Sequence, residues 1–153
     1  MRFTRITIIK TTEPTNDNTN ELLQWFGGTL GLFNIRDKDR SCFRIFITLI
    51  NSLKQKKGIS SDEIANKTGL TRGTVVYHLN KLMEVGLVGE TNNRYYLKHE
   101  TLEEISESIR EEINEAFDSL SYIGRNLDKK LALNTKKWKQ HKQNYHLRKE
   151  NTT

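Results

Sequence analysis

Residues 60–88 read SSDEIANKTGLTRGTVVYHLNKLMEVGLV and contain two short helical segments joined by a tight turn. Ser60 and Glu63 have the spacing of a capping box, which satisfies free N–H groups at the start of a helix. Gly69 stands where the first helix must end, because the chain leaves a helix most easily through a left-handed backbone that favours glycine. Thr71 then has the position of a cap for a second helix.

The apolar residues of both segments repeat at helical spacing. The expected inward positions are Ile64 and Ala65 on the first helix and Val75, Leu79 and Leu82 on the second. Ala65 is small, as a close crossing of two helices requires. The spacing of Ala65, Gly69 and Val75 predicts a helix-turn-helix, in which the second helix has the shape to enter the DNA major groove.

The chain after Gly86 predicts a β-hairpin. Leu87–Thr91 and Arg94–Lys98 can pair as strands around Asn92–Asn93, since asparagine tolerates the left-handed conformation of a tight turn. A helix-turn-helix followed by a hairpin is a winged helix. The predicted fold class is therefore mainly α with a small β-hairpin, a winged helix-turn-helix followed by a long C-terminal dimerisation helix.

That last helix is the longest of the chain and opens on a second capping box, Thr101–Glu104. Its apolar residues step by three or four throughout: Leu102, Ile105, Ile109, Ile113, Ala116, Leu120, Ile123, Leu127 and Leu131. A helix over 102–131 is about 45 Å long, more than a domain of this size covers. We expect the residues from Leu102 to Leu127 to form the interface of a homodimer.

Four regions follow from these patterns: an N-terminal arm and linker (1–20), the winged helix domain (21–100), the dimerisation helix (101–133) and a basic tail (134–153). Within the second region, Ser41–Lys54 predicts a central helix with apolar residues around most of its circumference. Glu21–Phe33 is expected to break into a short helix and a packed loop, because three glycines interrupt it.

Acidic and basic residues are concentrated in different parts of the chain, although the net charge is only +6. Residues 100–118 carry eight acidic residues and one arginine, whereas residues 1–99 and the tail are basic. This polarity suggests one face turned to a polyanion and one turned away. The absence of a long apolar run excludes a membrane span, and the single cysteine fits a reducing compartment, so a cytoplasmic, nucleoid-associated protein is expected.

The second helix of the predicted helix-turn-helix carries the candidate DNA contacts. Arg72 in the first turn can bind guanine bidentately or hold a phosphate, and Lys81 is expected to contact phosphate. Gly73 allows the backbone to approach closely, and Arg94 beside the hairpin turn can enter a narrow minor groove or act as a solvated side chain. The full set is Thr71, Arg72, Gly73, Thr74, Tyr77, His78, Lys81 and Arg94.

Catalysis and metal binding find no support in the sequence. The four histidines have no cysteine or carboxylate partners at metal-site spacing, and no phosphate loop, nucleophile elbow or HExxH pattern occurs. The acidic residues of the long helix are distributed as a solvated face. We therefore expect no enzyme, no metal and no cofactor, and double-stranded DNA as the partner, with a small-molecule effector of unknown identity possible.

Leu70–Val88 resembles the ArsR-type winged-helix regulators, whose pattern matches here at Leu70, Thr74, Val75, His78, Leu79, Leu82, Gly86, Leu87 and Val88, with Thr71 in place of serine. The resemblance covers roughly residues 40–100 and implies a homodimeric DNA-binding regulator. Gly28–Ile50 is more loosely similar to archaeal winged-helix proteins. Metal-sensing members carry cysteine pairs on the helix before the turn, where this chain has Ile64, Ala65 and Asn66, so a metal-sensing role is not carried over.

Three alternatives stay open at this point. The winged helix can serve as a protein-interaction module in a transcription or chromatin assembly. The dimer interface, or the segment Leu22–Phe33 with Trp25, can hold a small apolar ligand. The basic tail can bind RNA. The leading hypothesis is a sequence-specific, homodimeric DNA-binding regulator.

Overall fold

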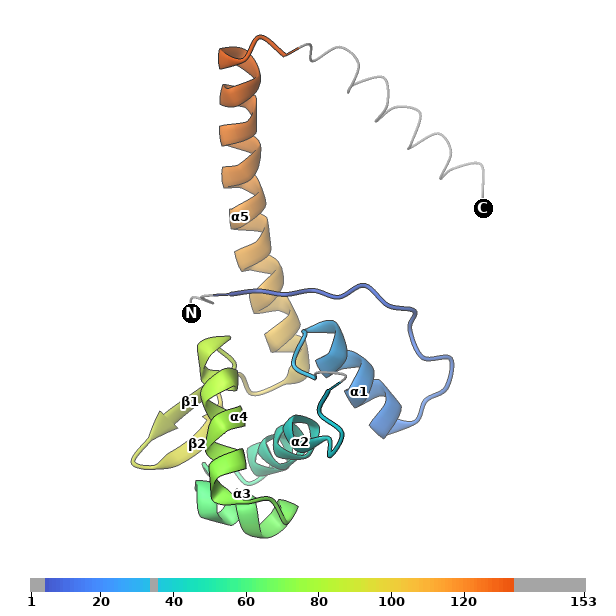
Figure 1. The fold of residues 1–153 in the computed structure, drawn as a ribbon, viewed down its shortest axis with the longest axis vertical. Helices are drawn as coiled ribbons and strands as arrows, with labels where there is room; N and C mark the ends of the chain where they lie inside the picture. Colours follow the sequence, from blue (N-terminus) through green and yellow to red (C-terminus); the bar gives the residue numbers. More distant parts are fainter. Residues whose placement is uncertain (1–4, 34–35, 134–153) are drawn as a thin grey trace. The chain divides into compact units, whose positions relative to one another are not determined.

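The computed structural model describes residues 5–33 and 36–133, which form five helices and one hairpin (Figure 1). The elements are α1 (Thr19–Thr29), α2 (Ser41–Leu53), α3 (Ser61–Thr68), α4 (Arg72–Glu84), β1 (Val88–Thr91), β2 (Arg94–Leu97) and α5 (Leu102–Lys130). The predicted fold class is confirmed: the chain is mainly helical, with a two-stranded wing and a long C-terminal helix. It divides into two compact units, residues 1–112 and 113–153. The predicted basic tail, 134–153, lies outside the described residues.

Helix α2 is the centre of the first unit. It contacts α3, α4 and β2, and its side chains Ile45, Phe46 and Leu49 have no exposed surface. The N-terminus of α2 is capped from the preceding loop, where Asp37 Oδ2 accepts a hydrogen bond from the Cys42 N–H at 3.0 Å. Cys42 itself is buried. The prediction of a central helix over Ser41–Lys54 is therefore correct to within one residue.

The helix-turn-helix has the end groups that its sequence predicts. Ser60 Oγ accepts from the Glu63 N–H at 3.1 Å, and Glu63 Oε2 accepts from the Ser60 N–H at 2.8 Å, which completes the capping box. Gly69 ends α3 with φ of 68°, in the left-handed region. Thr71 Oγ1 accepts from the Thr74 N–H at 3.2 Å and caps α4. Val75, Leu79 and Leu82 form the buried stripe of α4.

The wing is a tight antiparallel hairpin. Val88 pairs with Leu97 and Thr91 with Arg94, around Asn92 and Asn93 at φ of 52° and 59°. A turn with both central residues at positive φ matches the twist of the strands, which explains the two asparagines. Ile59 adds a bridge that the sequence reasoning did not predict: its N–H and carbonyl bond Tyr95 at 2.9 and 2.8 Å. The wing is thereby attached to the segment that enters α3.

The short helix and following loop expected in Glu21–Phe33 are present. Helix α1 continues through Gly27 and Gly28 and ends at Thr29. Gly27 is needed for packing rather than for a turn, because a Cβ there would clash with the Phe33 ring. That ring is held edge-on against Phe43 and Phe46 at centroid distances of 5.3 and 6.1 Å.

The apolar residues of α5 divide into two groups. Ile105 and Ile109 are buried within the chain's own first unit, so we correct their assignment as dimer-interface residues: they belong to the core. Leu102 and Ile113 are half-buried. The large residues beyond them on the helix are exposed, namely Phe117, Leu120, Ile123 and Leu127, followed by Leu131 after its end.

Two neighbouring glycines provide a matched test of this packing. Gly27→Ala is expected to lower the free energy of unfolding by about 1–3 kcal/mol, because the methyl group overpacks the Phe33 ring, which is packed against Phe43 and Phe46. Gly28→Ala is expected to raise it by up to about 1 kcal/mol, since no atom lies within 4 Å of the added Cβ and alanine favours a helix. Urea unfolding measures both; equal effects would contradict the role of Phe33.

Candidate nucleic-acid interface

The outer face of α4 presents polar and aromatic side chains over most of its length. Arg72, Gly73, Tyr77 and Lys81 are exposed, and Thr74 is half-exposed. Gly73 has no atom within 4 Å of where a Cβ would stand, so its backbone is open to close approach. The hydroxyls of Thr71 and Thr74 lie 2.8 Å apart at the start of the helix. Thr74, Tyr77 and Lys81 therefore share the face of α4 opposite its buried stripe, and Arg72 is exposed in the first turn of the helix, beside that face.

Arg72 forms an exposed ion pair with α3. Its Nε lies 3.4 Å from Asp62 Oδ1, and both side chains are about 70% exposed, at 70% and 69%. An ion pair this exposed contributes little free energy, because water screens both charges. Arg72 is thus positioned near the first turn of α4 yet readily released to an anion of higher charge density, such as a phosphate.

Tyr77, His78 and Lys81 form a second cluster along α4. The ammonium of Lys81 lies 4.5 Å from the centre of the Tyr77 ring, a cation–π contact, and the rings of Tyr77 and His78 pack edge-on at 5.1 Å. A hydrogen bond with Tyr77 raises the pKa of Lys81, which stays charged. Burial lowers the pKa of His78 below 6.5, so His78 is neutral at pH 7. His78 is half-buried, which makes it a support for Tyr77.

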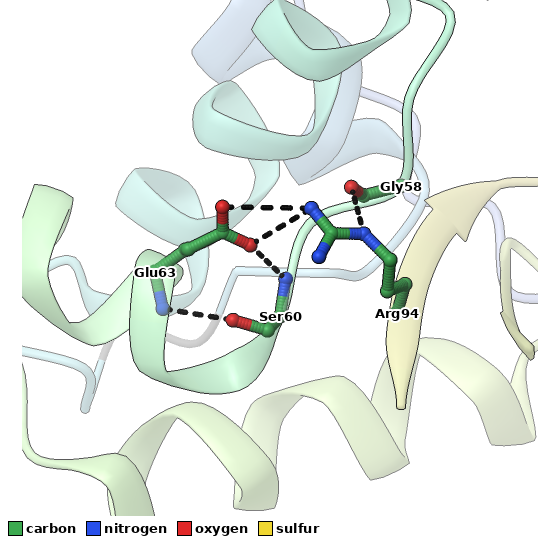
Figure 2. Close-up of polar contacts among 4 residues, drawn as sticks. All are labelled: Gly58, Ser60, Glu63 and Arg94. Carbon is green, nitrogen blue, oxygen red and sulfur yellow. Dashed lines mark hydrogen bonds and ion pairs between the residues drawn. The ribbon is translucent and has the colours of Figure 1, made fainter. Parts of the chain in front are cut away.

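Arg94 lies beside the turn of the wing, as predicted, and its side chain is bonded within the domain. Figure 2 shows its guanidinium between the Glu63 carboxylate and the Gly58 carbonyl: Nε donates to Gly58 at 2.8 Å, and a terminal nitrogen donates to Glu63 Oε2 at 3.1 Å. Because Nε and one terminal nitrogen of the guanidinium are engaged within the domain, Arg94 ties the wing to the start of α3. Its contact with DNA stays a prediction, and the structure assigns it this contact within the domain.

Glu63 is the residue that sequence reasoning undervalued. Its carboxylate completes the capping box and also receives Arg94, so it joins the start of α3 to the wing (Figure 2). Hydrogen bonds from Ser60, followed by the charge of Arg94, lower the pKa of Glu63. The sequence predicted the capping role of Glu63. It could not predict the contact with Arg94, because residues 31 positions apart share no periodic pattern.

Within residues 5–33 and 36–133, no group of three or more histidine, cysteine or acidic side chains has the geometry of a metal site. In the same part of the chain, no helix is long and apolar enough to cross a membrane. Burial raises the pKa of the Cys42 thiol to about 12, which leaves it protonated and unreactive at neutral pH.

Comparison with known protein families assigns a DNA-binding class to the region that contains α3 and α4. Residues 47–88 match a family model described as winged helix-turn-helix DNA-binding. The match begins inside α2 and ends at the first residue of β1, so it includes all of α3 and α4. Searches of curated proteins and of solved structures gave no match. The chain thus contains a winged helix-turn-helix of the DNA-binding class, a class that is typically non-enzymatic.

The tie between Glu63 and Arg94 predicts a pH dependence. The lowered pKa of Glu63 means that its stabilising contribution is complete above about pH 4.5, its unperturbed value, and is lost as the pH falls through the lower pKa of the folded state. Glu63→Gln keeps a cap for the Ser60 N–H but has no charge to lose. Its free energy of unfolding is expected to fall less steeply below pH 4.5 than that of the unaltered protein.

Chemical denaturation between pH 6 and 2.5 measures this difference. Asp62→Asn is the matched control, because Asp62 lies on the same turn without contacting the wing. Identical slopes for Glu63→Gln and the unaltered protein would contradict the tie.

Proposed function

We propose that this chain is a sequence-specific DNA-binding transcriptional regulator that acts as a homodimer. The observation that carries the proposal is the exposed surface of α4, the second helix of a winged helix-turn-helix, with Arg72 in its first turn and Tyr77 and Lys81 on its outer face. That helix is the part of such a domain that enters a major groove. The sequence pattern of Leu70–Val88 supports a regulator of the ArsR type.

Affinity and specificity would come from different residues of this face. Arg72 would exchange Asp62 for a guanine edge or a phosphate, and Lys81 would move from the Tyr77 ring to the DNA backbone. Thr74 and Tyr77 are placed to reach base edges beside them. Thr71 and His78 would contribute indirectly: Thr71 caps the start of α4, and His78 packs against the Tyr77 ring.

The homodimer is supported by the exposed apolar side chains of α5. Phe117, Leu120, Ile123 and Leu127 are each about half or more exposed, at 61%, 65%, 52% and 49%. Exposed apolar residues repeated at three- and four-residue spacing are the pattern of a helix that pairs with another helix. Two copies would then present two α4 helices to successive major grooves, about 34 Å apart. The cytoplasmic, nucleoid-associated location belongs to this proposal, and the small-molecule effector stays a prediction without assigned residues.

The DNA proposal is tested by the double variant Arg72→Ala/Lys81→Ala. Loss of two phosphate or base contacts per chain is expected to abolish tight operator binding and to reduce the salt slope by about 0.9 per lost phosphate contact. Fluorescence anisotropy of genomic and random duplexes, titrated with salt, measures both. The control Arg125→Ala/Lys129→Ala removes the same two residue types from exposed positions of α5 and should bind as the unaltered protein does.

Undiminished binding by the Arg72→Ala/Lys81→Ala variant would remove α4 as the DNA-contacting helix. Weak binding of every duplex by the unaltered protein, lost at physiological salt, would favour the protein-interaction module instead.

The homodimer is tested separately with Leu120→Glu. A charge buried in an apolar seam is expected to weaken the dimer about 100-fold. Tyr122→Glu introduces the same charge half a turn or so away, on the opposite face of α5, and should leave the dimer intact. Sedimentation equilibrium across a concentration series measures the association. A monomer for the unaltered protein at all concentrations would reject the homodimer while leaving DNA binding to be judged on its own.

A further inference from the structure

The apolar stripe of α5 is symmetric about Leu120. Counting equal distances in both directions along the helix pairs Phe117 with Ile123, Ala116 with Gly124, and Ile113 with Leu127. Each large residue thereby meets a large one, and the two small ones meet each other. A helix that reads the same in both directions can pack against an antiparallel copy of itself, with Leu120 of each copy at the twofold axis.

The charged residues beside the stripe have the same symmetry. Glu112 and Lys130 are 18 residues apart, which is five whole turns, so they lie on the same flank of the stripe. Arg110 and Asp128 are also 18 residues apart and lie on the other flank. In an antiparallel pair related by a twofold axis, each flank faces the same flank of the second copy.

This geometry places opposite charges together. With Leu120 on the axis, Glu112 comes within two residues, about 3 Å along the helix, of Lys130 of the second copy, and Arg110 comes equally near to Asp128. The twofold repeats each pair, which gives four pairs of opposite charge and none of like charge on the two flanks. All four side chains have accessible surface in the single chain.

A parallel pair has no such match. Residues 102–118 of α5 carry seven acidic side chains and one arginine, whereas residues 119–130 carry three basic and one acidic. Parallel helices would align the acidic halves with each other, and antiparallel helices align acidic with basic. Like charges that face each other destabilise helical pairs, so the charge distribution acts against the parallel orientation as well as for the antiparallel one.

We propose that a second copy of this chain covers the exposed stripe of α5 in antiparallel orientation, centred on Leu120, with Glu112–Lys130 and Arg110–Asp128 pairs between copies. This rests on the proposed homodimer and adds its orientation and register. In this pairing Ile113 of one copy meets Leu127 of the other, and Ile113 never meets Ile113.

Cysteine crosslinking measures the orientation directly. Ile113→Cys and Leu127→Cys variants are prepared separately, mixed and oxidised mildly; Cys42 is buried and stays in place. The antiparallel pair is expected to give a disulfide-linked dimer from the mixture and almost none from either variant alone. A crosslinked dimer from Ile113→Cys alone would show a parallel pair, and no crosslink in any sample would show that another partner, or none, covers the stripe. Either result overturns the proposal.

A charge exchange gives a second readout in variants with an unaltered stripe. Glu112→Lys is expected to weaken the dimer roughly tenfold, because two attractive pairs become repulsive. Glu112→Lys/Lys130→Glu in the same chain should restore it, whereas Glu111→Lys, on the outer face, should have no effect. Failure of the second substitution to restore the dimer would overturn the register. DNA anisotropy on the same samples tests the proposed function independently.

Discussion

Burial of α2 is the constraint on which the rest of the domain depends. Ile45, Phe46 and Leu49 are fully enclosed, and each neighbouring element contributes a different side of the enclosure. Helix α4 packs on α2 with its buried stripe, α3 contacts both α2 and α4, and the wing contacts α2 through β2. Because the inner face of α4 is fixed by this packing, its outer face is fixed as well, and the polar residues there have a defined direction.

The wing is attached at three points that act together. Ile59 bridges Tyr95, Arg94 bonds the Gly58 carbonyl, and Glu63 receives Arg94 while it caps α3 (Figure 2). Gly58 makes this possible, since a Cβ there would lie 3.0 Å from the Arg94 Cβ. A two-stranded hairpin alone is marginally stable in water, so these contacts give the wing much of its definition. In this structure Arg94 fixes the position of the wing relative to α3.

The helix caps and turns, which depend on residues close together in the sequence, were predicted correctly. The capping box at Ser60, the left-handed Gly69 and the asparagine turn of the wing are set by residues within a few positions of one another, and each is present. What the sequence did not reveal concerns contacts between residues distant from one another. The packing of Gly27 against Phe33 leaves no periodic trace, and the tie between Arg94 and Glu63 joins residues 31 positions apart. Ile105 and Ile109 continue the stripe of α5 without interruption, so periodicity alone could not separate a core contact from an exposed one.

Cys42 has a practical consequence for measuring the motions of the domain. It is the only cysteine of the chain, it begins the central helix, and it is both shielded and held protonated by a pKa of about 12. Thiol reagents attack the thiolate, so modification at neutral pH requires the first turn of α2 to become exposed. The rate at which Cys42 is labelled therefore measures how often the core opens locally at the start of α2. The measurement needs no engineered probe, and it detects local opening, which equilibrium unfolding does not resolve.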